Sequence, residues 1–172
     1  MVVSKSKRIR KHGISPLTQP SLSDALEACT KRCKEMEAPL GERLNAFAED
    51  VRELAPQFAG IVDRMVDRLQ SAGAGDAAPA VGDPMPPFVL PDENGHLVSL
   101  ADLLEVSKTV VTFHRGHWCP YCRINAFALA KVEPEVNAAG GQLVIITPEI
   151  QRYGRQLKAE SGGKFPILTD LD

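Results

Sequence analysis

Residues 109–123, TVVTFHRGHWCPYCR, join a β-branched run to two cysteines three positions apart. The run TVVTF has the composition of a buried β-strand. Beyond it, apolar residues recur at helical spacing. This predicts a helix from about Pro120, kinked at Pro134, with one apolar side formed by Ile124, Phe127, Ala128 and Val132. A strand, a short loop and a helix therefore place Cys119 and Cys122 where the helix begins.

The sequence after this helix repeats the alternation. QLVIIT, residues 142–147, predicts a second buried strand, and FPIL, residues 165–168, predicts a third. Between them, Pro148 marks the first turn of another helix, which Gly162 and Gly163 end. Three strands separated by two helices imply right-handed crossovers, so the predicted fold class is α/β with a layered sheet.

The sequence before residue 109 predicts a hairpin and a short helix. FVLPDENGHLVSL, residues 88–100, has two short apolar runs around Asn94 and Gly95, which is a hairpin signal. Ser99 and Asp102 have the spacing of a capping box over the helix that follows. The preceding stretch, residues 71–80, is small and glycine-rich and has the character of a linker.

Residues 21–70 predict two or three amphipathic helices. Ser21 and Asp24 have capping-box spacing, and a first apolar stripe follows at Leu22, Leu26, Cys29, Cys33 and Met36. A second stripe runs from Leu40 to Leu69 and is broken near residue 55 by Pro56. Both stripes need a partner surface, which is either the main domain or a second subunit.

Cys29 and Cys33 lie on the first of these stripes. Four residues apart on a helix, they could share a metal ion, but no histidine or second cysteine pair lies nearby in the sequence. Small buried apolar side chains are therefore the better interpretation of this pair.

Composition and charge limit the location and partners of the protein. The chain has 172 residues and a net charge of -2, with basic residues concentrated in a head formed by Lys5, Lys7, Arg8, Arg10 and Lys11. No aromatic residues interleave with these charges and no amphipathic face is visible, so a disordered tail is favoured over a nucleic-acid or membrane contact. The sequence has no bilayer-spanning or secretory segment, which predicts a cytoplasmic protein.

These patterns divide the chain into three parts. Residues 1–20 are predicted to be the basic disordered tail, residues 21–78 an amphipathic helical extension with its linker, and residues 79–172 the α/β domain. In the cytoplasm structural disulfides are rare, and a Cys-x-x-Cys pair is more often catalytic or metal-binding.

The position of the cysteine pair predicts redox chemistry. A helix N-terminus lowers the pKa of a thiol because its free N–H groups and its dipole favour the thiolate. Cys119 is expected at or near the N-cap, pointing at solvent, and Cys122 one turn inside, close enough to form a disulfide with it. Arg115 and Arg123 are expected to add positive charge on either side.

Two other interpretations of the pair are weaker. A zinc site would take His114, His117, Cys119 and Cys122, but tetrahedral sites normally draw ligands from two separated loops, and the strand end would point His114 away from Cys122. A purely structural pair does not explain why Trp118 and Pro120 occupy the motif.

Four stretches of the chain, covering about Val81 to the end, are similar to the AhpC/TSA family, the peroxiredoxin-like branch of the thioredoxin superfamily. They are VGDPMPPFVLPDENGHLVSLADLL, TVVTFHRGHWCPYCR, GGQLVIITPE and FPILTDLD. The amphipathic helices and the motif resemble family members that carry a Trp–Cys–Pro–x–Cys variant. The resemblance implies a thioredoxin-like three-layer fold with an N-terminal helical extension.

The resemblance also implies an activity without an organic cofactor or a metal. A peroxidatic cysteinate attacks the O–O bond of a hydroperoxide, becomes a sulfenic acid, and forms a disulfide with a second thiol. An external dithiol such as thioredoxin then regenerates it. Counting from Phe113, the usual peroxiredoxin register makes Cys122 the peroxidatic residue. The Cys–Pro pair and the helix cap instead favour Cys119 as the nucleophile and Cys122 as its resolving partner, and this is the assignment we adopt.

The sequence departs from the family pattern around the motif. Peroxiredoxins place a proline seven residues and a threonine or serine three residues before the peroxidatic cysteine. Counting back from Cys122 gives Arg115 and Cys119, and counting back from Cys119 gives Thr112 and Gly116. These departures favour general thiol–disulfide exchange as the alternative activity. The apolar stripe from Leu40 to Leu69 suggests another alternative, a non-enzymatic redox-sensing or interaction module that binds a partner through this stripe.

The C-terminal end departs from the family as well. A thioredoxin-like sheet normally continues past FPILTD with a hairpin and a helix, and the family's second-half arginine would follow the third strand. We therefore expect the C-terminal part of the sheet to be missing, which leaves an open edge and an uncovered face. Either the N-terminal helices or a partner chain, such as the second copy in a homodimer, would cover this face, or the chain is a truncated family member.

Overall fold

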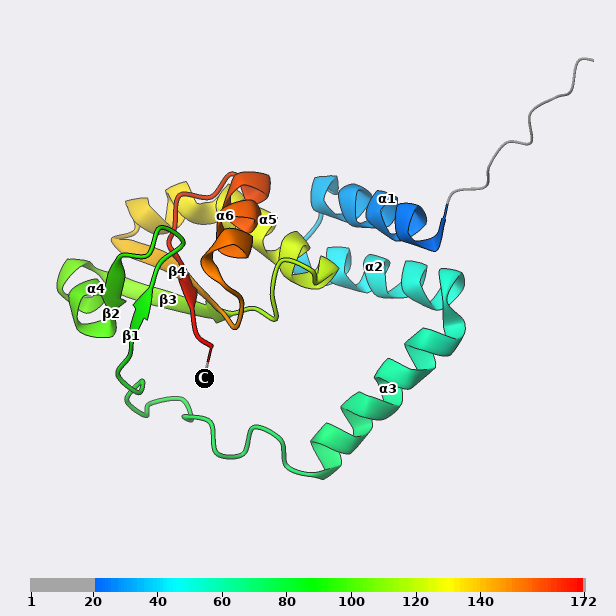
Figure 1. The fold of residues 1–172 in the computed structure, drawn as a ribbon, viewed down its shortest axis with the longest axis horizontal. Coiled ribbons are helices and arrows are strands. Elements are labelled where there is room, and N and C mark those ends of the chain that lie inside the picture. Colours follow the sequence, from blue (N-terminus) through cyan, green and yellow to red (C-terminus); the bar gives the residue numbers. More distant parts are fainter. Residues whose placement is uncertain (1–20, 172) are drawn as a thin grey trace, which may run out of the picture.

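A computed structural model describes residues 21–171 as helices and strands joined in a single chain (Figure 1). The predicted basic tail, residues 1–20, lies outside the described residues. The described elements are, in chain order, α1 (Leu22–Glu35), α2 (Leu40–Leu54), α3 (Pro56–Ser71), β1 (Val89–Pro91), β2 (Leu97–Ser99), α4 (Leu100–Val106), β3 (Lys108–Phe113), α5 (Pro120–Ala138), β4 (Gly141–Thr147), α6 (Gln151–Ser161) and β5 (Ile167–Thr169). Among the described residues, no helix combines the length and apolar character that crossing a bilayer requires.

The central sheet has the strand order β3–β4–β5, and both pairings are parallel. β4 lies in the middle, and its residues 143–147 are buried, as the run LVIIT predicts. β3 pairs only with β4 in the part of the chain that the structure describes, so the prediction of a buried strand at TVVTF is wrong. Val110 is 48% exposed and Phe113 is 70% exposed because β3 forms one edge of the sheet.

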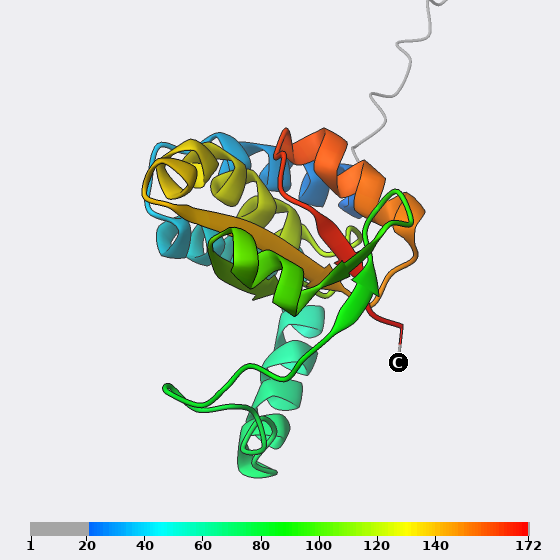
Figure 2. The same ribbon diagram turned by 90° about the vertical axis from the view of Figure 1, so that its left-hand side faces the viewer.

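Helices cover both faces of this sheet. α5 and α6 pack on one face around a core of Ala126, Leu143, Ile145, Leu157, Phe165 and Ile167. The antiparallel hairpin β1–β2 and α4 pack on the other face, around Leu103, Val144, Ile146 and Leu168. Figure 2 shows α4 and α5 on opposite sides of the sheet. This three-layer arrangement confirms the predicted thioredoxin-like α/β fold.

The helix termini follow the sequence signals in most cases. Ser21 caps α1 in the predicted capping box with Asp24, and Gly162 ends α6 in the left-handed conformation with φ 75°. α6 begins at Gln151, three residues after the predicted start at Pro148. Pro134 lies inside α5, which continues through it to Ala138.

α5 is covered on two sides, whereas the sequence predicted a single apolar face. Ala126 faces the sheet core, whereas Ile124 faces the helical extension, and both are fully buried. Val132, which was placed on the apolar face, is 42% exposed. A helix packed between two layers has apolar residues on two sides, so a single apolar stripe at helical spacing does not describe which of its residues are buried.

The helical extension packs on the outer side of α5. Cys33 and Phe47 from α1 and α2 form a buried cluster with Ile124. The interpretation as a small buried apolar residue is confirmed for Cys33, whereas Cys29 is only partly buried at the edge of the cluster. Burial raises the pKa of both thiols. The extension therefore covers α5 and not a face of the sheet, so the suggestion that it covers the sheet is wrong.

α3 follows the predicted break at Pro56 and extends away from the sheet (Figure 1). It contacts α2, and the rest of its apolar stripe is exposed at Phe58, Ile61, Met65 and Leu69. The linker then returns the chain to β1 (Figure 1). This arrangement brings the first turns of α3 close to the loop before α5.

Candidate active site

The loop between β3 and α5 places Cys119 at the N-cap of α5 and Pro120 at its first helical position, as predicted. Gly116 makes this loop possible, because it has a φ of 135° and a Cβ there would collide with the carboxylate of Glu149. That carboxylate accepts a hydrogen bond of 2.6 Å from the backbone N–H of His117. Glu149, which lies in the connection between β4 and α6, therefore fixes the position of this loop.

Cys119 does not point at solvent, and that prediction is wrong. Its side chain is 0% exposed. The guanidinium Nη2 of Arg115 lies 3.0 Å from its Sγ, and the same guanidinium carbon lies 5.3 Å from the ring centre of Trp118. Trp118 in turn donates a hydrogen bond of 3.1 Å from its Nε1 to the carbonyl oxygen of Arg115.

Arg115 contacts both sulfurs of the motif. Besides the contact with Cys119, its backbone N–H donates a hydrogen bond of 3.2 Å to the Sγ of Cys122. The sequence predicted only a general positive charge here. Arg123, the other expected charge, instead pairs with Glu27 at 2.7 Å and with Glu160 at 3.0 Å, so it links α5 to α1 and α6.

The environments of the two thiols move their pKa values apart. Hydrogen bonds from the thiol and the backbone N–H of Cys122 and from the Arg115 guanidinium outweigh burial and lower the pKa of Cys119 to about 5. The hydrogen bond to the Cys119 sulfur, together with burial, raises the pKa of Cys122 well above that of a free thiol. One sulfur is therefore a thiolate at neutral pH, and the other is a thiol that can donate a proton to it.

The histidines of the loop are separate from this pair. His117 lies 2.7 Å from Glu160 through its Nε2 and stacks on Tyr153. His114 is buried, neither of its ring nitrogens has a hydrogen-bond partner among residues 21–171, and burial lowers its pKa to about 4. In that same part of the chain, no three His, Cys, Asp or Glu side chains gather in a way that could hold a metal ion.

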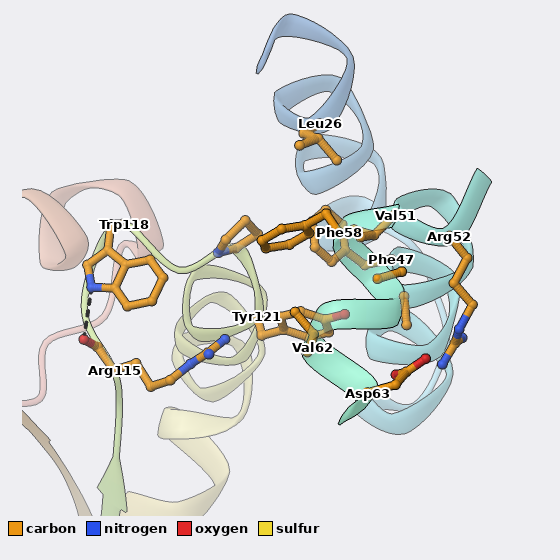
Figure 3. Close-up of a pocket in the computed structure, with 13 residues that line it drawn as sticks. Leu26, Phe47, Val51, Arg52, Phe58, Val62, Asp63, Arg115, Trp118 and Tyr121 are labelled. Atoms are coloured by element: carbon orange, nitrogen blue, oxygen red, sulfur yellow. Dashed lines mark hydrogen bonds between the residues drawn. The ribbon is translucent and has the colours of Figure 1, made fainter. Parts of the chain in front are cut away.

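A cavity of about 360 Å³ lies beside the loop, and the sequence did not predict it (Figure 3). It is lined on one side by α2 and α3 and on the other by the start of α5, with apolar contributions from Phe47, Val51, Phe58, Val62 and Tyr121. Trp118 and Arg115 also line it, and the Arg115 guanidinium lies 3.0 Å from the Cys119 sulfur. The stripes on α2 and α3 predicted apolar faces, but spacing alone does not identify the surface that they meet.

Comparisons with known proteins point to one family. The sequence profile described as the AhpC/TSA family matches residues 81–172, which is just over half of the chain. Rv2521 and its counterpart MT2597, from two strains of Mycobacterium tuberculosis and each named as a candidate peroxiredoxin, are 32% identical over 91 residues. That alignment covers 53% of this chain and 57% of the relative, so the chain spans little more than half the length of the curated relatives it matches.

A solved structure gives the same indication. The crystal structure of the peroxidoxin BcpB from Mycobacterium tuberculosis superposes with a TM-score of 0.50 and 25% identity, covering 52% of this chain and 58% of that protein. All of these matches span about half of this chain. The family profile begins at residue 81, after the three helices α1–α3.

Proposed function

The chain belongs to the AhpC/TSA family, and on that basis we propose that it reduces hydroperoxides through a dithiol cycle of Cys119 and Cys122. The observation that supports this most strongly is the pair of opposed pKa shifts at the start of α5, with Arg115 in contact with both sulfurs. A lowered pKa is what a nucleophilic thiol needs, and a neutral thiol one turn away is what a resolving residue needs.

The proposed cycle has three steps. The Cys119 thiolate attacks the terminal oxygen of the peroxide, an S–O bond forms as the O–O bond breaks, and the departing alkoxide or hydroxide takes up a proton. Cys119 is then a sulfenic acid, oxidised by two electrons. The Cys122 thiol attacks this sulfur, an S–S bond forms and water leaves. A thioredoxin-type dithiol reduces the disulfide and is itself oxidised to a disulfide.

Two further parts of the proposal concern the surroundings of the protein. Turnover needs a reducing compartment such as the cytoplasm, where a dithiol reductant is maintained. The exposed stripe on α3, formed by Phe58, Ile61, Met65 and Leu69, supports a homodimer contact through the N-terminal helices.

General thiol–disulfide exchange is the second candidate. The position of Cys119 at the N-cap, followed by Pro120, favours it, since this arrangement also suits attack on a disulfide sulfur. Stopped-flow rates for oxidation of the reduced protein by hydrogen peroxide and by a small disulfide separate the two. A faster reaction with the disulfide would favour exchange.

The direct test of the peroxide cycle is mass spectrometry after one equivalent of hydrogen peroxide. Cys122→Ser should trap a sulfenic acid on Cys119, detected as a dimedone adduct on the peptide that contains it. Cys119→Ser should show no adduct at Cys122. Peptide mapping excludes Cys29 and Cys33 as the source of the signal. An adduct at Cys122 alone would reverse the assignment, and no adduct in either variant would reject the function.

A further inference from the structure

The start of α5 carries both cysteines of the motif, and the helical extension contacts the same part of the helix. Cys119 is the N-cap, and Cys122 lies one turn inside. Tyr121, between them, makes an edge-to-face contact with Phe47 of α2, with the ring centroids 5.0 Å apart (Figure 3). Ile124 is fully buried in a cluster that also contains Phe47. Two residues close to Cys122 in the sequence therefore pack against one phenylalanine of the extension.

An ion pair connects the same end of α5 to α1. The guanidinium of Arg123 donates two hydrogen bonds, of 2.7 and 2.8 Å, to the two carboxylate oxygens of Glu27. Its Nε lies 3.0 Å from the carboxylate of Glu160 in α6. The backbone N–H of Arg123 donates a hydrogen bond of 3.1 Å to the carbonyl oxygen of Cys119. The residue bonded to the N-cap is thus itself fixed by the extension.

The contacts of the Cys119 sulfur depend on where this end of the helix lies. The sulfur accepts hydrogen bonds from the Cys122 thiol and, at 3.0 Å, from the Arg115 guanidinium. Arg115 belongs to the preceding loop, which Glu149 holds through the backbone N–H of His117. A shift of the helix start relative to this loop would lengthen the contact between the sulfur and the guanidinium, and hydrogen bonds weaken steeply with distance and angle.

We propose that Phe47 is a positioning residue, which holds the start of α5 where the Cys119 sulfur contacts Arg115. It acts through the ring of Tyr121, because a site keeps its productive geometry only when the residues around it are fixed by their own packing. Phe47 lies before the residues that the family profile matches, so the extension takes part in the redox site. This inference deepens, and rests on, the proposed dithiol chemistry of Cys119.

A substitution of Phe47 changes position without changing charge. Any change in the ionisation of Cys119 in such a variant therefore comes from the geometry of the helix start. The charged and titratable groups that face this region from the elements packed against it all remain, and they are Glu27, Arg52, Asp63, Arg115, His117, Cys122, Arg123, Glu149 and Glu160.

Phe47→Leu tests the inference, because leucine keeps the cluster apolar but removes the ring that contacts Tyr121. The measurement is the rate at which iodoacetamide labels Cys119 in the reduced full-length chain from pH 4 to pH 9, read by peptide mass spectrometry. Iodoacetamide reacts with the thiolate, so the rate follows ionisation. At pH 5 the rate should fall by about fivefold. At pH 8, where Cys119 is ionised in both proteins, it should change little.

Phe165→Leu is the matched control. Phe165 is 3% exposed and Phe47 is 1% exposed, but Phe165 belongs to the core between the sheet and α5 and α6. Phe165→Leu should be less stable than wild type in urea and should label Cys119 at the wild-type rate at pH 5. An unchanged rate in Phe47→Leu, or the same fall in Phe165→Leu, would overturn the inference.

Two variants of Tyr121 decide the question if Phe47→Leu does not fold. Tyr121→Phe keeps the ring that meets Phe47 and should keep the wild-type dependence of labelling on pH. Tyr121→Leu removes the ring and should reproduce the fall at pH 5. Identical profiles in these two variants would overturn the inference.

Oxidation by hydrogen peroxide separates this inference from the proposed function. If hydrogen peroxide oxidises Cys119 in the wild type but Phe47→Leu keeps the wild-type labelling profile, the inference fails and the proposed peroxide reduction remains. If hydrogen peroxide does not oxidise Cys119 but labelling at pH 5 falls in Phe47→Leu, peroxide reduction fails and the positioning role remains, for a thiol that acts in disulfide exchange.

Discussion

Arg115 is the residue on which the proposed chemistry depends most, because one side chain and its own backbone contact both sulfurs. The guanidinium is the charged group nearest to Cys119, and it also lies over the Trp118 ring. It therefore has two effects that oppose each other. It stabilises the thiolate, and it covers the thiolate from solvent.

Arg115→Gln should raise the pKa of Cys119, because it removes a charge-assisted hydrogen bond to the thiolate. The absorbance of the reduced protein at 240 nm, followed from pH 4 to pH 8, measures the ionisation. The thiolate fraction at pH 5 should fall by about tenfold. Arg123→Gln is the control, since Arg123 pairs with Glu27 and Glu160 and not with a sulfur. An unchanged curve in Arg115→Gln would contradict the assigned role.

His114 should make the fold less stable in mild acid. Burial lowers its pKa from 6.5 to about 4. Between these two values the unfolded chain binds a proton that the folded chain does not, so stability is lost as the pH falls from 6.5 towards 4. The loss amounts to about 3 kcal/mol.

Urea unfolding of wild type and His114→Phe at pH 7 and pH 5 measures this effect. The variant should lose less stability than wild type between the two pH values. His96→Gln serves as the control, because the His96 side chain is 80% exposed. Identical pH dependence in wild type and His114→Phe would show that His114 is not a buried neutral base.

Among the elements, the hairpin is tied to the sheet through one buried carboxylate. Glu93 is 3% exposed, forms an ion pair with Lys158 of α6, and accepts a hydrogen bond of 3.0 Å from the backbone N–H of Ile167 in β5. Burial raises its pKa, but Lys158 and these hydrogen bonds together lower it further, so the group is ionised at neutral pH. The contact joins the hairpin to α6 and β5, whose residues Lys158 and Ile167 lie 65 and 74 positions further along the chain.

Glu93→Ala should lower the free energy of unfolding by about 3 kcal/mol, because it leaves Lys158 and the Ile167 N–H without their partner. Denaturant unfolding at pH 7 measures this. Glu105→Ala, on the exposed side of α4, should cost less than about 0.5 kcal/mol. Comparable losses in the two variants would mean that the Glu93 contacts contribute little.

The helices and strands also differ in how well they could be predicted from the sequence. Some signals involve only residues that are close together in the sequence, and the elements they predict are present where expected. They are the hairpin signal around Asn94, the capping box at Ser21 and the helix end at Gly162. Glu93 was not found because its partners are separated from it by 65 and 74 residues. The exposure of Val110 was not predicted either, because a β-branched run does not reveal whether its strand is central or at an edge.

For the molecule as a whole, the extension and the α/β domain share one buried cluster and one ion-pair network. Cys33, Phe47 and Ile124 form the cluster, and Arg123 pairs with Glu27 across the same junction. The motif predicted both cysteines and their place at a helix start. The burial of Cys119 was not predicted. The cavity beside the loop depends on how α2 and α3 meet the loop, and periodicity carries no information on that contact.

The exposed stripe of α3 should hold two copies of the chain together in solution. Light scattering after size-exclusion chromatography should give the mass of a dimer for the wild type. Met65→Glu combined with Leu69→Glu should give the mass of a monomer, because charges do not pack against an apolar partner surface. Arg64→Glu, on the same helix but outside the stripe, is the control. A monomeric wild type would contradict the dimer.

The central claim is that Cys119 is ionised at neutral pH while Cys122 is not, and alkylation of the reduced protein tests it most directly. Iodoacetamide labelling at a series of pH values, read for each cysteine by peptide mass spectrometry, gives a separate profile for each sulfur. Labelling of Cys119 should reach half its maximum near pH 5, and Cys122 should stay unlabelled until far higher pH. Labelling of both cysteines only around pH 9, or of Cys122 first, would contradict the claim.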